Sequence, residues 1–290
     1  MSVNSMTTEQ PQPTVIVNRG QMEAPEVRPL AGGEVAFYSA RSPAKDTDNE
    51  DAAGLIPVVD GRAVMAVADG LGGQRAGAEA AELAIKALVA CATKAPPDMD
   101  LRTAILDGFE QANRSVTALG GGAATTLAAI EIDNSAVRPY HVGDSAIMVV
   151  GQRGRLRLLT VSHSPVGYAV EAGLLDEREA IHHEDRHLVS NIVGSAEMRI
   201  EVGRTLRLNP RDTVLLSSDG LFDNLHSAEI VEIIRKGPLA AAAERLVENC
   251  RRRMQEPQPD HPSHPDDLTF LIYRCSEDAR GRNRRPLTTM

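Results

Sequence analysis

The sequence predicts an α+β fold built on antiparallel sheets. Strands and helices occur in separate runs, in the order strands, helices, strands, helices, strand, unlike the regular alternation of a parallel βαβ protein. Asp60-Gly61 lies between two apolar runs and is a hairpin signal. Two successive segments then carry apolar residues at the i, i+3, i+4, i+7 spacing of an amphipathic helix. These observations favour layers of antiparallel sheets and helices.

The first half of the chain divides into three expected strands and two expected helices. Residues 34–40, 54–60 and 63–69 are apolar runs bounded by turn residues, which is typical of core strands. Helices are expected from residues 74 and 98 onward, because each segment has one apolar face. These faces consist of Ala80, Leu83, Ala84, Ala87 and Leu88 in the first helix and of Leu101, Ile105, Phe109, Ala112 and Val116 in the second.

The second half returns to strands. Short apolar stretches between residues 123 and 160 are separated by turn residues and predict an antiparallel meander. Residues 163–200 are less regular and are expected to form an excursion over the sheet. The expected elements are strands at 123–132, 136–142, 145–150, 155–160, 200–208 and 213–218, helices at 228–236 and 239–253, and a last strand at 267–275.

The two ends of the chain differ in composition from its centre. Residues 1–32 are rich in Gln, Pro, Thr and Glu with little periodicity, and residues 276–290 are polar and basic. Segments of this kind bury too little apolar surface to fold. We therefore expect a disordered N-terminal tail over 1–32, one folded domain over 33–275, and a flexible basic C-terminal tail over 276–290.

Composition and charge argue against several classes of protein. The formal net charge of −9 lacks the basic surface of a nucleic-acid-binding protein. No apolar stretch approaches the roughly 18 residues of a membrane span, and the first residues lack the regions of a secretory signal. Cys91, Cys250 and Cys275 form no CxxC pair and are interpreted as reduced thiols. We expect a cytoplasmic protein that binds neither nucleic acid nor a membrane.

Two of the expected strands end in the same way, with Asp69-Gly70 and with Asp219-Gly220. A single Asp-Gly is more often a turn than a site, but a matched pair indicates carboxylates that meet. Mg²⁺ and Mn²⁺ prefer oxygen ligands, and carboxylates from neighbouring strand ends could hold two ions about 3.5–4 Å apart. The following glycine would let backbone carbonyls approach closely. Further candidates at strand ends are Asp51, Asp144 and Asp266.

Two other polar patterns have simpler interpretations. Histidines in the polar loops could suggest a zinc site, but no cysteine accompanies them and solvated histidines are far commoner. The three arginines at 251–253 are interpreted as the basic last turn of a helix, where they interact favourably with the helix dipole. The loop histidines, which we interpret as solvated, are His182, His183, His187, His261 and His264.

Eight short motifs occur in the order in which one known family carries them. The motifs are NEDA at 49–52, VADGLGG at 67–73, ATTLAA at 124–129, HVGDSAI at 141–147, LTVSHSP at 159–165, SNIVGS at 190–195, LLSSDGLFD at 215–223 and DDLTFLI at 266–272. With these motifs the chain resembles the metal-dependent type 2C (PPM) serine/threonine protein phosphatases, in particular their bacterial members. The similarity runs over residues 34–274, and so covers the folded domain, which would be the catalytic domain.

The resemblance implies an α-β-β-α sandwich, with two central antiparallel sheets flanked by helices and a binuclear Mn²⁺ or Mg²⁺ centre at one end. In this family the residue matching Asp69 bridges both ions, the carbonyl of the residue matching Gly70 is a ligand, and the residue matching Glu50 orients a metal-bound water. Asp144 would hold a weaker third ion together with Asp219. The implied metal set is Glu50, Asp51, Asp69, Gly70, Asp144, Asp219 and Asp266.

The implied reaction is hydrolysis of phosphoserine or phosphothreonine in a protein substrate. A hydroxide that bridges the metals attacks phosphorus in line with the leaving oxygen, and no phosphoenzyme is needed. Such a protein would oppose a serine/threonine kinase in signalling, and we expect a monomer. The alternatives are a catalytically inactive phosphoprotein-binding regulator with the same fold and a hydrolase of small phosphoesters.

Three positions depart from the family pattern. Family members usually place an arginine a few residues before the NED triplet; here we expect Arg41 to grip the phosphate, with Lys45 as the alternative. Leu71 stands where many eukaryotic members carry a histidine proposed as general acid, so a metal-bound water is expected to donate the proton. Asp267 stands where asparagine is common. Alternation along a strand lets only one of Asp266 and Asp267 face the cleft.

Overall fold

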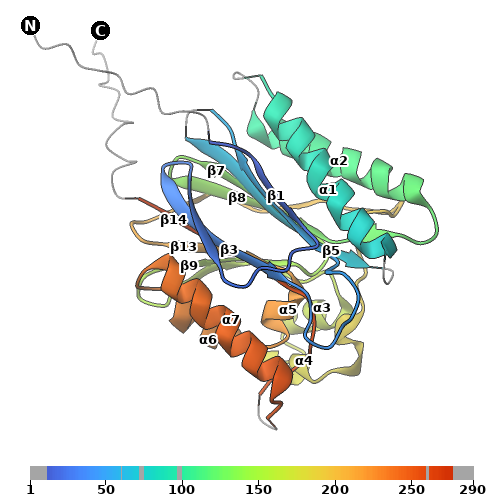
Figure 1. Ribbon diagram of the computed structural model, residues 1–290, viewed down its shortest axis with the longest axis vertical. Helices are drawn as coiled ribbons and strands as arrows, with labels where there is room; N and C mark the ends of the chain where they lie inside the picture. Colours follow the sequence, from blue (N-terminus) through green and yellow to red (C-terminus); the bar gives the residue numbers. More distant parts are fainter. Residues whose placement is uncertain (1–11, 60, 72–74, 97–99, 259–260, 277–290) are drawn as a thin grey trace, which may run out of the picture.

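The computed structural model describes residues 12–276, except 60, 72–74, 97–99 and 259–260. Two antiparallel sheets pack face to face with helices on both outer sides, which confirms the expected α-β-β-α sandwich (Figure 1). The first sheet has the order β1 (Val15–Asn18), β4 (Asp51–Pro57), β5 (Arg62–Leu71), β7 (Leu127–Asp133), β8 (Ala136–Val142) and β11 (Glu201–Val202), with β6 (Ala124–Thr125) beside β5 and β12 (Leu206–Arg207) beside β8. The second has the order β10 (Leu156–Leu159), β9 (Ala146–Val150), β13 (Thr213–Ser217), β14 (Leu268–Cys275), β3 (Gly33–Ala40) and β2 (Glu26–Leu30).

Two long helices cover the outer face of the first sheet, and two more cover the second (Figure 1). The first pair is α1 and α2, and the second is α6 and α7. The apolar faces expected for α1 and α2 are confirmed, because Leu88 and Phe109 are fully buried in one cluster with residues of the first sheet. The bounds are α1 (Arg75–Lys94), α2 (Leu101–Leu119), α6 (Ser227–Ile234) and α7 (Leu239–Gln255).

The side chains of an apolar strand point alternately to its two faces, so one strand contributes to two layers of the hydrophobic core. In β5, Val64 and Ala66 pack in the layer under α1 and α2. Met65 and Val67 pack between the two sheets, where they join Leu216 of β13. Because successive side chains of a strand point to opposite faces, a strand buried on both sides needs apolar residues throughout. This explains the continuous apolar run that precedes Asp-Gly in β5.

The irregular segment after β10 folds into short helices. These are α3 (Pro165–Glu171), α4 (Glu177–Ile181) and a 3₁₀ turn over Glu184–His187. Figure 1 shows them beside α5 (Asp219–Phe222), which directly follows β13. The expected excursion is therefore present, and it lies next to one of the two Asp-Gly strand ends.

The N-terminal segment differs from the prediction. Residues 15–18 and 26–30, expected in a disordered tail, form β1 and β2 at the edges of the two sheets. β1 pairs with β4 and β2 pairs with β3. Such short strands carry little local pattern and depend on the partner strand for stability, so composition alone misassigned them. Residues 1–11 and 277–290, the remainder of the two expected tails, lie outside the described residues.

The expected meander between residues 123 and 160 is also wrong in one respect. β7 and β8 pair as expected, but β9 and β10 belong to the second sheet. β9 pairs with β13 and not with β8, so the chain crosses between the sheets at Gly143-Asp144. A turn signal marks where a strand ends, whereas the identity of the next partner depends on burial in the assembled sandwich.

Candidate metal centre

Carboxylates from both sheets gather at one end of the sandwich. Asp51 begins β4 and lies opposite Asp69 of β5, Asp219 follows β13, and Asp266 precedes β14. Asp144 lies in the crossing from β8 to β9. The charges of Asp51, Asp144 and Asp266 act on Asp69, and the charge of Asp69 in turn acts on Asp219. The structure therefore brings together the five aspartates that the sequence pattern indicated.

Two threonines of the ATTLAA motif hold the backbone of Asp69. The N–H of Asp69 donates to the Thr126 hydroxyl at 3.0 Å. The Asp69 carbonyl accepts from the Thr125 hydroxyl at 2.7 Å and from the Thr126 N–H at 2.8 Å. The Thr126 hydroxyl also lies 2.7 Å from the hydroxyl of Ser145, which follows Asp144. The motif therefore ties together the segments that carry two of the carboxylates.

Asn49 and Ser218 position Asp51. The Asn49 amide donates at 3.0 Å to the carbonyl of Gly20 and at 3.0 Å to the hydroxyl of Ser39. The Asn49 side-chain carbonyl accepts from the N–H of Asp51 at 2.9 Å, and the Ser218 hydroxyl donates to Asp51 Oδ2 at 2.8 Å. The asparagine of the NEDA motif therefore has a structural task, which is to hold the start of β4.

The glycine after each aspartate lets two backbone segments meet. A β-carbon on Gly70 would lie 2.2 Å from the carbonyl oxygen of Gly77. A β-carbon on Gly220 would lie 2.0 Å from the carbonyl oxygen of Asp267. Both distances are far below the 3.0 Å that real β-carbons respect. The repeated Asp-Gly therefore reflects tight backbone packing around the carboxylates.

Asp266 and Asp267 differ in their surroundings. Asp267 is 3% exposed, and its two carboxylate oxygens accept from the backbone N–H of Ser42 at 2.7 Å and of Glu50 at 2.8 Å. Asp266 is more exposed, and its charge acts on Asp69 and other members of the cluster. Asp267 therefore links two loops with both of its oxygens, and Asp266 is the more exposed of the pair and acts on Asp69 and Asp219.

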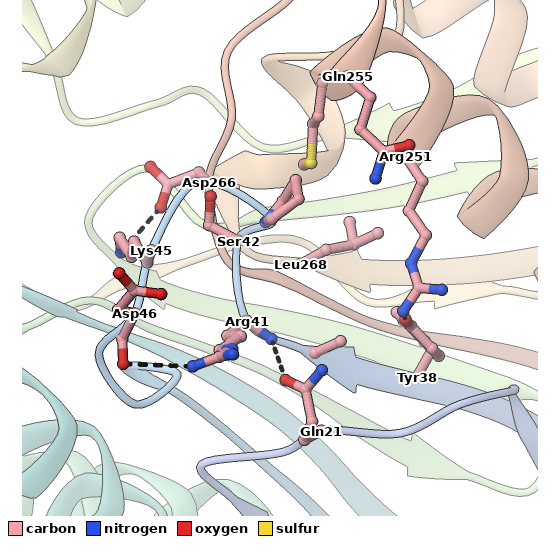
Figure 2. Close-up of a pocket in the computed structure, with 13 residues that line it drawn as sticks. Gln21, Tyr38, Arg41, Ser42, Lys45, Asp46, Arg251, Gln255, Asp266 and Leu268 are labelled. Atoms are coloured by element: carbon pink, nitrogen blue, oxygen red, sulfur yellow. Dashed lines mark hydrogen bonds and ion pairs between the residues drawn. The ribbon is translucent and has the colours of Figure 1, made fainter.

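Lys45, and not Arg41, reaches the carboxylates. Its Nζ lies 3.2 Å from oxygens of Asp266 and Asp267 and 3.4 Å from Oε2 of Glu50. Burial lowers the pKa of Lys45, but the two aspartates raise it by more, so the amine stays charged. The Arg41 guanidinium instead donates to a backbone carbonyl of its own loop at 3.3 Å and lines a neighbouring cleft (Figure 2).

Burial and repulsion oppose ionisation in the centre. Burial, assisted by the charge of Asp267, raises the pKa of Asp51 to about 8. Burial also raises the pKa of Asp69 and of Asp219 well above the usual range, and neighbouring aspartates add to both shifts. For Asp144, burial raises the pKa to about 6. Carboxyl groups forced together in this way favour either protons or a bound cation.

Several oxygen atoms of the centre fit a hard divalent cation. Among the described residues, Glu50 Oε1, Asp51 Oδ1 and Asp219 Oδ1 are buried without a hydrogen-bond partner. The carbonyl oxygen of Gly70 and Glu50 Oε1 both approach Gly77, at 2.9 and 2.5 Å from where its β-carbon would lie. Buried oxygens are costly when they bind nothing, and carboxylate and carbonyl oxygens are the ligands that Mg²⁺ and Mn²⁺ prefer.

A buried histidine supports the segment of Asp144. His163 Nδ1 accepts from the N–H of Gly143 at 3.1 Å, and its Nε2 lies 3.1 Å from Oε2 of Glu201. The Asn191 amide lies 2.9 Å from the same Nδ1. His163 and Asn191 belong to the motifs LTVSHSP and SNIVGS, to which the sequence assigned no task. The partners of His163 lie 20 to 38 residues away, so no local pattern could reveal these contacts.

One pair of loop histidines is not simply solvated. The rings of His187 and His264 lie 4.5 Å apart, and His264 Nδ1 lies 3.5 Å from Asp223. His264 is half-buried, so its interpretation as a solvated residue was wrong. Arg186 Nε lies 3.8 Å from Asp223 and supplies positive charge at this cluster. Possible ligand atoms lie within 4.8 Å of one another in two groups of described residues, His187–Asp223–His264 and His141–His163–Glu201.

The chain is similar to known protein phosphatases. A family model described as protein phosphatase 2C matches residues 41–258. Protein phosphatase PhpP of Streptococcus pneumoniae serotype 2 is 33% identical over 214 residues, which cover 70% of this chain and 85% of the relative. Serine/threonine phosphatase stp of Listeria monocytogenes serotype 4b is 30% identical over 247 residues, which cover 81% and 93%.

Solved structures show the same fold. The S. agalactiae serine/threonine phosphatase has a TM-score of 0.73 and 26% identity, covering 84% of this chain and 100% of that chain. The catalytic domain of serine/threonine protein phosphatase PstP, solved with two manganese ions, has a TM-score of 0.67 and 26% identity, covering 84% and 98%. With a family model that spans most of its folded part, this chain belongs to the protein phosphatase 2C family.

Proposed function

We propose that this protein hydrolyses phosphoserine and phosphothreonine in protein substrates with the help of bound Mn²⁺ or Mg²⁺. The observation that carries the proposal is the set of buried carboxylate oxygens without partners where the two sheets meet. Gathering carboxyl groups that repel one another costs folding free energy, so a purely structural role does not explain them. The two manganese ions of the PstP structure support the same cofactor here.

The donor atoms suggest how the residues share the metal ions. Asp69 is central to the cluster and would help to hold the ions, with the carbonyl of Gly70 as a further ligand. Glu50 would orient a water, and Asp144 with Asp219 would hold a third ion. When bound, the ions lower the pKa of water and neutralise phosphate charge. The remaining carboxylate ligands would be Asp51 and Asp266.

Two cations are candidates for binding the phosphate oxygens. Lys45 lies among the carboxylates, with its ammonium group 3.2 Å from Asp266. Arg41 lines the adjacent cleft, and its guanidinium can form a bidentate pair with an anion. We assign the contact with the reacting phosphate to Lys45 first. Arg41 would assist from the side of the cleft.

The cellular setting follows from the proposed reaction. A serine/threonine kinase that adds the phosphate would be the functional counterpart of this protein, and phosphorylated proteins would be its substrates. We further propose a monomer that acts in the cytoplasm. Within the described part of the chain, every helix is too short or too polar to cross a bilayer.

Phosphate release from a phosphothreonine peptide tests the proposal. The purified protein is assayed with EDTA, Mg²⁺ or Mn²⁺, beside Asp219→Asn and the control Asp133→Asn, which changes an exposed aspartate at the end of β7. We expect release that requires metal, survives in Asp133→Asn and is lost in Asp219→Asn. Calorimetric titration with Mn²⁺ should show weakened binding for Asp219→Asn only.

The same assay separates the alternatives. A folded protein that binds phosphopeptide but releases no phosphate with any metal would be an inactive regulator, and the proposal would fail. Faster turnover of nucleotides or other small phosphoesters than of the peptide would also overturn the proposed substrate class. Release in the presence of EDTA would contradict the metal centre itself.

A further inference from the structure

A cleft adjoins the carboxylate centre between the end of β3 and the C-terminal end of α7. Its volume is about 260 Å³. Figure 2 shows Lys45 and Asp266 on one side of it, Arg251 with Tyr38 on the other, and Arg41 between them. Lys45 and Asp266 also belong to the carboxylate centre, so the cleft leads directly out of the proposed active site.

Arg251 is held in place on the far side of the cleft. Its guanidinium carbon lies 5.6 Å from the centre of the Tyr38 ring, and one nitrogen donates to the Tyr38 hydroxyl at 2.5 Å. Tyr38 is fully buried in β3, and burial raises the pKa of its hydroxyl, so Tyr38 stays neutral. The tyrosine therefore orients the guanidinium without neutralising its charge.

The three arginines at the end of α7 have different surroundings. Arg253 is buried and pairs with Glu229 at 2.7 Å. Arg252 is exposed and donates to the side chain of Asn249 on its own helix at 2.6 Å. Only the first of the three lines the cleft. The interpretation of this run as a favourable helix end therefore leaves the position of Arg251 unexplained.

The charges around the cleft leave two guanidinium groups available. Lys45, which is assigned to the reacting phosphate, lies on the side of the carboxylate centre and pairs there with Asp266 and Asp267. Among the ion pairs found in the described residues, none joins a carboxylate to Arg41 or to Arg251. A guanidinium carries five N–H donors in a planar fork that matches a carboxylate or a phosphate. Asp46 and Asp266 also line the cleft, beside two guanidinium groups that form no ion pair with them, of which Arg251 is oriented by Tyr38.

We propose that this cleft binds an acidic group of the substrate protein, a carboxylate or a second phosphate, close in sequence to the phosphorylated residue. The inference rests on the proposed function and adds a substrate preference to it. Arg251 would be the specificity-determining residue. Arg41 lies in the cleft between Arg251 and the metal centre.

The fold sets the approximate spacing of the two anions on a substrate. The N–H of Ser42 bonds Asp267 beside the centre, and Arg251 stacks on Tyr38, four positions earlier in the chain. Extended chain rises about 3.3 Å per residue, so the backbone positions of Tyr38 and Ser42 are at most about 13 Å apart, and the two anion sites are expected to be separated on this scale. An extended substrate covers that distance in about four residues. The acidic group is therefore expected two to four positions from the phosphorylated residue.

A peptide series tests the preference. Phosphothreonine peptides carry a single glutamate at each position from −4 to +4 in turn, with glutamine at the same position as the matched control. A second set carries a non-hydrolysable phosphonate side chain in place of the glutamate. We expect one position at which the acidic peptide has a kcat/KM roughly tenfold higher than the glutamine peptide. The two sets distinguish a site for a carboxylate from a site for a phosphate.

Variants of adjacent arginines separate the cleft from general charge. The preference is the kcat/KM of the acidic peptide divided by that of the glutamine peptide. Arg251→Gln should reduce this ratio to about one, as expected when a charged hydrogen bond is lost. Arg252→Gln removes the same charge from the exposed side of α7 and should keep the ratio. Arg251→Lys should retain part of it. A native protein that does not distinguish the peptides, or an Arg251→Gln protein that still does, would overturn the inference.

The design distinguishes failure of this inference from failure of the proposed function. If the glutamine peptides are hydrolysed as fast as the acidic peptides, the proposed binding of an acidic group in the cleft is refuted, and the phosphatase proposal stays intact. If no peptide is hydrolysed, fluorescence anisotropy of the same labelled peptides measures the preference as binding. Equal affinity for acidic and neutral peptides would then refute the cleft as well.

Discussion

Gly220→Ala is the sharpest test of how the centre is assembled. The new β-carbon would lie 2.0 Å from the carbonyl oxygen of Asp267, whereas ordinary contact begins at 3.4 Å. The atom that it meets belongs to the backbone, so no side-chain rotation can relieve the clash. Asp267 would have to move, and Asp266, which precedes it, would move away from the other carboxylates.

The expected cost follows from this geometry. Overpacking costs about 1–3 kcal/mol, and an immovable backbone contact places Gly220→Ala near about 3 kcal/mol, or roughly 6–12 °C in melting temperature. Urea unfolding in EDTA measures this cost, and Mn²⁺ titration measures the expected loss of affinity. Gly151→Ala is the control, since its β-carbon would lie 3.6 Å from the nearest atom. Equal stability and equal Mn²⁺ affinity of the two variants would refute the reasoning.

Three further predictions concern the same region. Thr126→Val removes the hydroxyl that accepts from Asp69 and should lower the free energy of unfolding by about 1–2 kcal/mol; an unchanged urea midpoint would contradict this. Mn²⁺ at about 100 times its Kd should stabilise the native protein by about 2.7 kcal/mol, and equal thermal shifts in Asp219→Asn would argue against the centre. Burial lowers the pKa of His141, so the unfolded chain takes up that proton first and the contribution of His141 to stability is lost as pH falls below about 6.5. His141→Gln should flatten that acid loss in urea titrations at several pH values, and an identical slope would exclude the histidine as its cause.

Much of the fold follows from local pattern. The apolar spacing of α1 and α2 and the apolar runs of β3 and β5 predicted these elements because each buries one face or two faces of a regular structure. The same reasoning failed for β1 and β2, whose few residues are ordered by strands distant in the chain. It also failed for the partner of β9, which the assembled sheet decides.

The candidate site divides in the same way. The aspartates and the glycines that follow two of them stand in short motifs, so the sequence by itself indicated which carboxylates gather at this end of the sandwich. Only the tertiary structure showed that both Asp267 oxygens are bonded to backbone N–H groups, that Lys45 reaches the carboxylates, and that Arg251 lines the cleft. Local sequence specifies which groups a strand end carries, but hydrogen bonds and charges act across space between segments far apart in the chain. The tertiary structure is therefore needed to show which oxygens are already hydrogen-bonded and which cations form no ion pair, because the partners come from both sheets.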